Sequence, residues 1–480
     1  MPSATPRSAL AIRPHPSTSH EPPPQSTSTN KLKHRPCTSY PDLASDPFSL
    51  SGLTAVQHLS YSTSPSLSSR PKKRPMPTPR QTIAVVNSSG RQAASFIRVA
   101  SAVGYHVRAQ LRNLDGIVAT EISSLPNVTV IVGDLYIKPS PTSSAGLSGP
   151  SETGVNHDLI KDLFRGTQLA FINTTFWGDE VAIGKALADA AMQAGIQHYI
   201  YSSMPNHHLQ NAHWPSLPLW SSKYTIETYI RSLPSLLPKT TFLYTGIYNN
   251  NFTSLPYPLF CMELQEDGSF KWTAPFHPDV PLPWLDAEHD VGPAVLQIFK
   301  DGTSRWGNGE RIALAYEMLS PRQACRVFSR GIGRPVRYKL QSKIDVKVKI
   351  PNGYREQLLA LEKMYAIGRE DGRLQPLYFG EERLENSCPD EAMALWEGYR
   401  GLEEYAREVF PLEEAANGLT WMNEDGDLDA DAGRVQEQER EEEEDDDDDD
   451  DVLVMGGGLS SGPGTGGENT PARKEESWLA

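Results

Sequence analysis

The sequence predicts an α/β fold with a doubly wound parallel sheet and a second, smaller α/β domain. Three observations predict it. First, a buried-strand pattern at Ile83–Val86 runs into a turn of small residues. Second, a helix follows, with apolar or small residues on one face at Ala93, Ile97, Ala100 and Val103. Third, strand and helix patterns continue to alternate as far as residue 244, which is typical of a parallel sheet.

The remaining elements are expected in chain order. Strands are predicted at Tyr105–Leu111, Val128–Val132, Leu169–Ile172, His198–Tyr201 and Thr241–Tyr244, and helices at Glu180–Ala194 and Trp220–Leu233. Beyond residue 248 the alternation loosens, and proline-rich loops surround short segments. Helices are expected there from Asp290, which we interpret as an N-cap, and at Pro321–Arg330, Tyr354–Tyr365 and Pro389–Val409.

The turn at Asn87–Gln92 has the position and composition of a phosphate-binding loop. It reads Asn87, Ser88, Ser89, Gly90, Arg91, Gln92, and only the middle glycine of the G-x-x-G-x-x-G pattern is present. Asn enters left-handed backbone conformations more easily than most residues, and Ala93 still permits close packing of helix and sheet. A strand, a turn and a helix in this order hold a pyrophosphate at the helix N-terminus, so we predict a dinucleotide site.

Composition and pattern set the expected domain boundaries. Residues 1–80 hold ten Lys and Arg against three Asp and Glu, which indicates a disordered basic extension rich in Ser and Pro. Residues 81–250 are assigned to the nucleotide-binding domain, with 138–157 as a disordered insertion and helix 287–300 packing back on it. Residues 251–423 are assigned to the smaller domain. Residues 424–480, with 21 acidic and four basic residues, are assigned to a disordered acidic tail.

The basic extension has two further interpretations. Its Ser-rich and acid-poor composition also fits an organellar transit peptide. The cluster Arg70–Arg74 could instead act as a nuclear import signal. We expect the protein in the nucleus and cytoplasm.

Several classes of function are disfavoured by composition. No run of 18 apolar residues is present, so no membrane span is expected. The four cysteines are scattered, which fits neither a disulfide framework nor a zinc site. His207, His208 and His213 lie in one loop but lack a carboxylate or cysteine at ligand spacing, so we predict no metal.

Two positions further along bear on the cofactor and its use. Arg112 ends the second strand, where an arginine accommodates the 2′-phosphate of NADP. Dehydrogenases of the short-chain class carry a tyrosine four residues before a lysine on the helix after the fifth strand. Here Lys223 is present, but the tyrosine position is Leu219, which can neither donate nor accept a proton. We predict a cofactor bound as a ligand, no catalytic residues and no enzyme activity.

Read together, these residues resemble the NmrA-like family of atypical short-chain dehydrogenases. The resemblance covers most of residues 81–423, and its carriers include Phe171–Thr175, His198–Pro205, Gly246–Pro258 and Pro283–Gly292. It implies a Rossmann domain that binds NAD or NADP, with the oxidised forms favoured in our interpretation. It also implies control of nitrogen metabolite repression as a corepressor, through contact with a GATA-type zinc-finger activator rather than with nucleic acid.

The resemblance also implies places for the cofactor. Asn87–Gln92 would hold the pyrophosphate and Arg112 the adenosine ribose. Further cofactor contacts would come from Gly133, Asp134, Asn173, Thr174, Thr175, Lys223, Ile247, Tyr248, Asn249 and Asn250.

For the partner we propose an acidic or polar face, because a zinc finger that binds DNA is basic. Asp286, Glu288 and Asp290, with Gln297 and Phe299 on the same helix, are the candidates. An alternative function is an NADPH-dependent reductase of the isoflavone-reductase type, with Lys223 as base. A third is an NADPH sensor with a different partner.

Overall fold

The computed structural model describes residues 81–137, 154–176, 178–367 and 375–419. Its strands are β1 (Thr82–Val85), β2 (His106–Leu111), β3 (Val128–Val132), β4 (Tyr136–Ile137), β5 (Gly154–Val155), β6 (Leu169–Ile172), β7 (His198–Ser203), β8 (Thr240–Thr245), β9 (Ile247–Tyr248), β10 (Met262–Leu264), β11 (Phe270–Ala274), β12 (Leu282–Leu285), β13 (Glu310–Leu314), β14 (Glu317–Leu319) and β15 (Val336–Leu340). Its helices are α1 (Arg91–Ala102), α2 (Ile117–Ser124), α3 (His157–Leu163), α4 (Glu180–Gln193), α5 (His207–Gln210), α6 (Pro218–Arg231), α7 (Ala287–Asp301), α8 (Thr303–Trp306), α9 (Pro321–Ile332), α10 (Asn352–Ala366), α11 (Glu382–Ser387), α12 (Asp390–Leu395), α13 (Leu402–Glu408) and α14 (Phe410–Ala416), with short 3-10 turns at η1 (Leu237–Lys239) and η2 (Asn249–Asn251).

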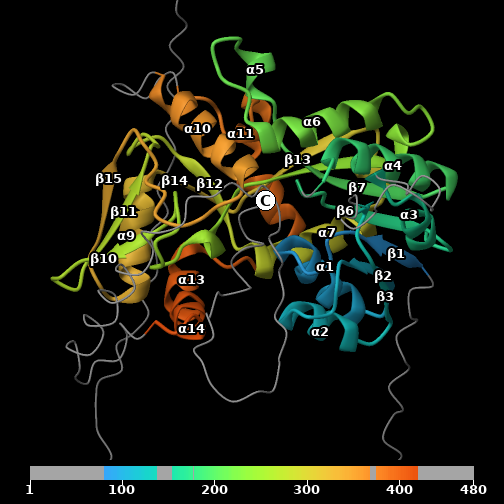
Figure 1. Ribbon diagram of the computed structural model, residues 1–480, viewed down its shortest axis with the longest axis horizontal. Helices are drawn as coiled ribbons and strands as arrows, with labels where there is room; N and C mark the ends of the chain where they lie inside the picture. The colour runs from blue at the N-terminus through green and yellow to red at the C-terminus, as the bar shows by residue number, and fades with distance from the viewer. Residues whose placement is uncertain (1–80, 138–153, 177, 368–374, 420–480) are drawn as a thin grey trace, which may run out of the picture. The chain divides into compact units, whose positions relative to one another are not determined.

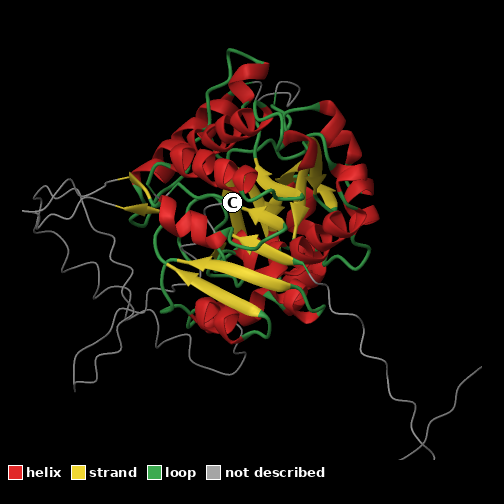
Figure 2. Ribbon diagram, turned by 90° about the vertical axis from the view of Figure 1, so that its right-hand side faces the viewer, coloured by secondary structure: helices red, strands yellow, loops and turns green. Residues whose placement is uncertain are grey.

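The largest sheet has seven parallel strands in the order β13-β8-β7-β6-β1-β2-β3. The chain order reverses between β1 and β6, which makes this the switch point of a doubly wound sheet. Helices α4 and α6 lie on one side of it and α1 and α2 on the other (Figure 1). The predicted fold class is confirmed, and Figure 2 shows the strands of this sheet between the two helix layers.

Strand β1 shows why both faces of the sheet are covered. Ile83 and Val85 belong to a core with α1 and α7, while Ala84 and Val86 belong to a core with α4 and α6. Side chains alternate between the faces of a strand, so a continuous apolar run needs a helix layer on each side.

Helix α7 comes from the second half of the chain and packs against α1. The two helices approach closely at Gly292, whose N–H donates to Ser95 Oγ at 2.9 Å. A Cβ at Gly292 would lie 2.5 Å from the Ser95 carbonyl oxygen, so any larger residue would force the helices apart. This contact fixes the start of α1, and therefore the predicted phosphate turn, against a helix of residues 251–423.

The smaller part of the chain contains two three-stranded sheets, β10-β11-β15 and β14-β12-β9. In Figure 1 the sheet β10-β11-β15 lies beside α9, well away from β1–β3. Its core is aromatic: Phe252 stacks on Trp284 and meets the edges of Trp272 and Phe328, with ring centroids 5.2 to 5.5 Å apart. Large aromatic side chains bury much apolar area in a small domain.

Three details of the sequence prediction are corrected. Strand β13 lies within the range assigned to the smaller domain, yet it pairs with β8 as the seventh strand. Its apolar run, residues 312–314, is too short to stand out in the sequence. The predicted helix at Pro389–Val409 is two helices, α12 and α13, because residues 396–401 leave helical geometry. The predicted insertion 138–157 ends earlier, since Gly154–Val155 form β5 and Asn156 caps α3; its other residues lie outside the described ranges.

The N-cap of α7 is Asp286 rather than Asp290. The Asp286 carboxylate accepts hydrogen bonds from the backbone N–H groups of Glu288 and His289, each at 3.1 Å. Asp290 lies one turn inside the helix and accepts the Asp286 backbone N–H at 3.1 Å. The two acidic residues therefore stabilise the helix start from both sides.

Candidate functional site

The turn after β1 has the geometry that the sequence predicts. Asn87 has φ of 55°, a left-handed conformation, and the Gly90 N–H donates to its carbonyl at 2.9 Å. A Cβ at Gly90 would lie 2.7 Å from Asn87 Nδ2, so the tight turn favours glycine there. Helix α1 begins directly after Gly90, and no side chain caps its first turn. Its first backbone N–H groups are thus available to an anion.

Gln110 holds this turn and is a site residue that the sequence analysis missed. Its side chain accepts the Asn87 N–H at 3.2 Å and donates to the Gly133 carbonyl at 2.9 Å, which joins the ends of β1 and β3. Gln110 is buried, and a polar residue near the end of an apolar strand is the signal that would have singled it out.

The other predicted cofactor residues follow the carboxyl ends of the strands. Asn173 and Thr174 follow β6, beside the turn after β1, because β6 and β1 are paired neighbours. Arg112 and Asp134 are exposed after β2 and β3, and Gly133 has φ of 150°. The remaining members, Thr175, Ile247, Tyr248 and Asn249, lie after β6 and β8.

Polar atoms at this edge are consistent with a bound polar ligand. Among the described residues, buried side-chain atoms without a hydrogen-bond partner include Arg91 Nε, Gln92 Oε1, both amide atoms of Asn249 and Asn250 Nδ2. Unpartnered buried polar groups are costly, and a dinucleotide carries donors and acceptors that could satisfy them. The residues present therefore fit a nicotinamide dinucleotide. Asn250 also has a structural role, because its Oδ1 accepts the Ala287 N–H at 2.9 Å.

Lys223 lies in a buried polar cluster below the end of β6. Its Nζ donates to Asn173 Oδ1 at 3.3 Å, to Glu180 Oε1 at 3.1 Å and to the Thr174 carbonyl. The side chains of Lys223 and Glu180 are each 5% exposed, and Ser222 donates to the second oxygen of Glu180. An ammonium group has three N–H donors, and all three are used here.

Leu219 lies one turn before Lys223 on α6, and both line the same pocket. The tyrosines on this helix are elsewhere: Tyr229 donates to Asp189 at 2.7 Å, and Tyr224 lines a different pocket. Tyr248 reaches the site from β9, but burial raises its pKa to about 12. Its hydroxyl accepts a hydrogen bond from Gln92 Nε2 at 2.5 Å.

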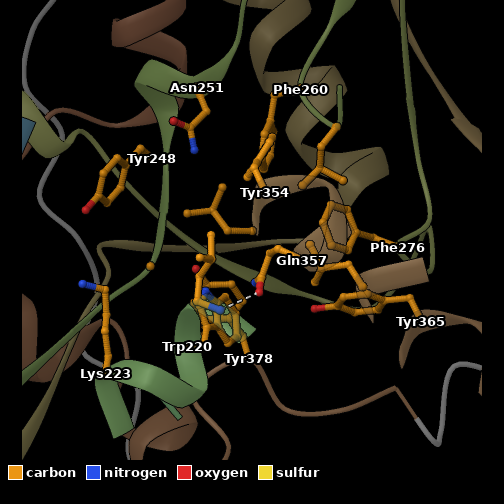
Figure 3. A pocket seen from close by; sticks show the side chains of 15 residues that line it. Trp220, Lys223, Tyr248, Asn251, Phe260, Phe276, Tyr354, Gln357, Tyr365 and Tyr378 are labelled. Carbon is orange, nitrogen blue, oxygen red and sulfur yellow. Dashed lines mark hydrogen bonds between the residues drawn. The ribbon is translucent and has the colours of Figure 1, made fainter. Parts of the chain in front are cut away.

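Seven of the fifteen residues that line the pocket beside Lys223 are aromatic. Figure 3 shows Tyr248 and Lys223 on one side and Phe276 and Tyr365 on the opposite side. Its full lining is Leu219, Trp220, Lys223, Gly246, Ile247, Tyr248, Asn251, Leu259, Phe260, Phe276, Tyr354, Gln357, Leu361, Tyr365 and Tyr378. The free volume is about 80 Å³, smaller than the roughly 150 Å³ of a cavity known to admit benzene.

Arg91 and Glu288, predicted for two different roles, contact each other. The buried Arg91 side chain forms an ion pair with Glu288 at the start of α7 and a second with Glu413 of α14 at 3.5 Å. Burial and the two carboxylates act in opposite directions on the Arg91 pKa, and the net effect raises it. The predicted phosphate turn is thus joined to α7 and α14, and no pattern in the sequence indicates the contact with Glu413.

The proposed acidic partner face is not assembled at the surface. Asp290 is fully buried, where it accepts from the Arg400 backbone N–H at 3.0 Å and contacts His289 at 2.6 Å. Phe299 is buried against Phe96 and the edge of His198. Gln297 is half-buried and donates to Asp301 at 2.7 Å. Phe299 lies on the side of α7 that packs on α1, whereas Asp290 lies on the opposite side and is covered by the segment around Arg400, so the prediction fails for both as surface contacts.

The described residues hold no cluster of three or more His, Cys, Asp or Glu side chains that could bind a metal. His207 Nε2 instead contacts the Leu377 carbonyl, and His208 contacts that of Trp214, each at 2.9 Å. No helix in the described ranges combines the length and apolar character needed to cross a membrane.

Comparison with known proteins agrees with this fold. The nitrogen metabolite repression protein nmr of Neurospora crassa is 66% identical over 370 residues, which cover 75% of this chain and 75% of that protein. The corresponding protein nmrA of Emericella nidulans is 52% identical over 370 residues, which cover 72% of this chain and 99% of the relative.

Crystal structures of NmrA, a negative transcriptional regulator, have been solved in complex with NAD and with NADP. Each has 55% sequence identity and a TM-score of 0.63, and the match covers 71% of this chain and 99% of the NmrA chain. The sequence model of the NmrA-like family matches residues 79–406. This chain belongs to the NmrA-like family.

Proposed function

We propose that this protein is a non-catalytic, NAD(P)-binding negative regulator of transcription in nitrogen metabolite repression. The single observation that supports the absence of catalysis is that the Lys223 ammonium group is fully hydrogen-bonded within the protein. Its ammonium is held by Glu180, Asn173 and Thr174, and the residue one turn before it is Leu219. A site with leucine at the tyrosine position and with an engaged lysine can hold a nicotinamide but lacks the Tyr-x-x-x-Lys pair that moves the proton.

The regulatory part rests on the relatives. Two proteins at 66% and 52% identity are named for nitrogen metabolite repression. The solved NmrA complexes contain NAD and NADP, which supports a dinucleotide at the turn Asn87–Gln92 here. The nucleotide acts as a ligand, with the oxidised forms preferred, because a regulator has no use for a hydride donor. Arg112 is exposed at the end of β2 and is the residue proposed to meet the adenosine ribose or its phosphate.

The proposed partner is a GATA-type zinc-finger activator, bound in the nucleus, with the protein also present in the cytoplasm. Glu288 and Gln297 stay candidates for that contact, since neither is fully buried. Asp290 and Phe299 would contact a partner only after α7 moved.

A reductase of the isoflavone-reductase type is the competing function, and the aromatic pocket is the observation in its favour. Phe260, Phe276 and Tyr354 would suit a phenolic ring. The engaged Lys223 and the small free volume oppose it.

Calorimetric titration of the full chain with NAD, NADH, NADP and NADPH separates the two functions. Binding of the oxidised forms at least tenfold tighter than the reduced forms, a difference of about 1.4 kcal/mol, is the result expected of the regulator. Tight NADPH binding with oxidation on adding a phenolic enone would instead establish the reductase. A second titration with a recombinant GATA-type zinc finger tests the partner, and absence of binding would reject it.

A further inference from the structure

Positive charge is concentrated in one segment of the smaller part. Residues 321–350 hold nine Lys and Arg against a single acidic residue, Asp345, in a chain whose net charge is −15. This segment comprises α9, β15 and the extended stretch that follows. Arg322 and Arg330 pair with Asp279 and Glu403, and an excess of one charge sign among the others attracts groups of opposite charge.

The pattern of burial shows where these charges point. Along β15 and the next ten residues, Val336, Tyr338, Ile344, Val346 and Ile350 pack against the core. Seven of the residues between them are exposed, and five of these are basic: Arg337, Lys339, Lys343, Lys347 and Lys349. Because alternate side chains of an extended chain point to opposite sides, these five lie on the outward side; we call them the basic face.

Little in the described structure neutralises the basic face. Lys347 has two weak ion pairs, with Glu263 at 3.6 Å and Asp345 at 3.7 Å. Lys339, Lys343 and Lys349 have no carboxylate within 4.0 Å among the described residues. In the register of the sheet, Arg337 lies opposite Lys271 of β11, whose charge is balanced by an ion pair with Glu263 at 2.5 Å.

The chain itself carries a complementary segment. Glu441–Asp451 is an unbroken run of eleven acidic residues, beyond the described structure. Helix α13 packs on α9, and α9 packs on the core-facing side of β15, which is opposite to the basic face. Figure 1 shows α13 and α14 beside α9. The 21 residues from 420 to 440 can span up to about 70 Å when extended, enough to reach the basic face.

We propose that the acidic run Glu441–Asp451 docks on the basic face of its own chain. Tethering supports the intramolecular contact over one with a separate polyanion, since a short flexible linker gives an effective concentration on the order of millimolar. Docked there, the run screens the basic face from other anionic partners. The contact is between solvated charges, so it weakens as ionic strength rises. It does not depend on the proposed regulatory function.

Zero-length carbodiimide cross-linking of the full chain, followed by mass spectrometry, tests the contact directly. Links from residues 441–451 to Lys339, Lys343, Lys347 and Lys349 are expected, at a yield independent of protein concentration. Exposed Lys161 and Lys300 on the large-sheet part serve as internal controls. Equal linking to the control lysines, or a yield that rises with protein concentration, would overturn the proposal.

A competition experiment measures the screening. The probe is a fluorescent peptide of eleven glutamates, and the comparison is between the full chain and a variant in which residues 441–451 become Gln and Asn. The neutralised tail is expected to raise probe affinity about tenfold at low salt, because a tethered competitor is removed. Adding Lys339→Gln, Lys343→Gln and Lys349→Gln should abolish that gain, while Lys161→Gln, Lys239→Gln and Lys300→Gln should not. Equal probe affinity with either tail would reject the docking.

Discussion

The two ends of the predicted cofactor site treat buried polar groups in opposite ways. At the turn after β1 and in η2, atoms of Arg91, Gln92 and Asn249 find no partner within the described chain. Around Lys223, every N–H of the ammonium already donates to an oxygen of the protein. An unpartnered buried group costs about 1–3 kcal/mol, so the first end favours a polar ligand and the second end is satisfied without one. Under the proposed function, the first end binds the nucleotide and the second end does not carry out hydride chemistry.

The largest effect, a loss of stability, is expected from removing the ammonium group of Lys223, which pairs with Glu180 at the second end. Lys223→Met leaves the carboxyl group of Glu180 buried without its ammonium partner, which should destabilise the protein by about 3–5 kcal/mol. Urea unfolding of the full chain, followed by circular dichroism, measures this loss. The matched control is the double variant Lys223→Met with Glu180→Gln, which removes both charges and should recover most of the stability. A single variant that loses less than about 1 kcal/mol would mean that the pair is solvated.

This cluster also marks a limit of the sequence analysis. Lys223 and Leu219 could be found from their spacing on a predicted helix, because a helical pattern fixes which residues lie one turn apart. Glu180 could not, since it begins a helix that is 43 residues away and reads as an ordinary acidic N-terminus. Contacts between distant segments depend on the packing of α4 on α6, which no local pattern encodes.

The first end should respond through nucleotide affinity rather than stability. Asn87 has φ of 55°, and a β-branched residue in that conformation costs roughly 1–2 kcal/mol. Asn87→Val is therefore expected to weaken NAD binding about tenfold, measured by calorimetry. Asn87→Gly is the matched control, because glycine adopts this conformation freely, and its affinity should stay within about threefold of the natural chain. Equal losses in both variants would show that the asparagine side chain, not the backbone conformation, holds the nucleotide.

The predicted strands show why the fold was easier to predict than the partner face. Apolar runs such as residues 83–86 and 169–172 can be buried only between two helix layers, so their pattern implies the architecture. The acidic residues at the start of α7 carry no such constraint. Asp290 is buried, and its carboxylate contacts the His289 ring and the Arg400 backbone N–H. Sequence alone could not distinguish such a buried carboxylate from an exposed one.

A smaller effect on nucleotide affinity should follow from removing the ion pair between Arg91, at the first end, and Glu288 of α7. Glu288 partly neutralises Arg91 next to the phosphate turn, so Glu288→Gln should increase the positive potential there. We expect NADP to bind about threefold tighter, measured by calorimetry at low salt. Glu121→Gln is the matched control, since Glu121 pairs with Arg98 on the same helix but away from the turn. Weaker binding in the Glu288 variant would indicate that the ion pair positions the turn rather than competing with the nucleotide.

The smallest effect, no change at all, is expected from restoring the missing tyrosine. Leu219→Tyr recreates the Tyr-x-x-x-Lys spacing on α6, but Lys223 stays engaged with Glu180, Asn173 and the Thr174 carbonyl. NADPH consumption with a phenolic enone should therefore stay at background, followed by absorbance at 340 nm. Combining Leu219→Tyr with Glu180→Gln, which loosens the cluster, tells whether the engaged lysine is the second barrier. Turnover by the single variant would mean that Leu219 alone separates this site from a working reductase. The hydrogen bonds that engage Lys223 would then not prevent hydride chemistry.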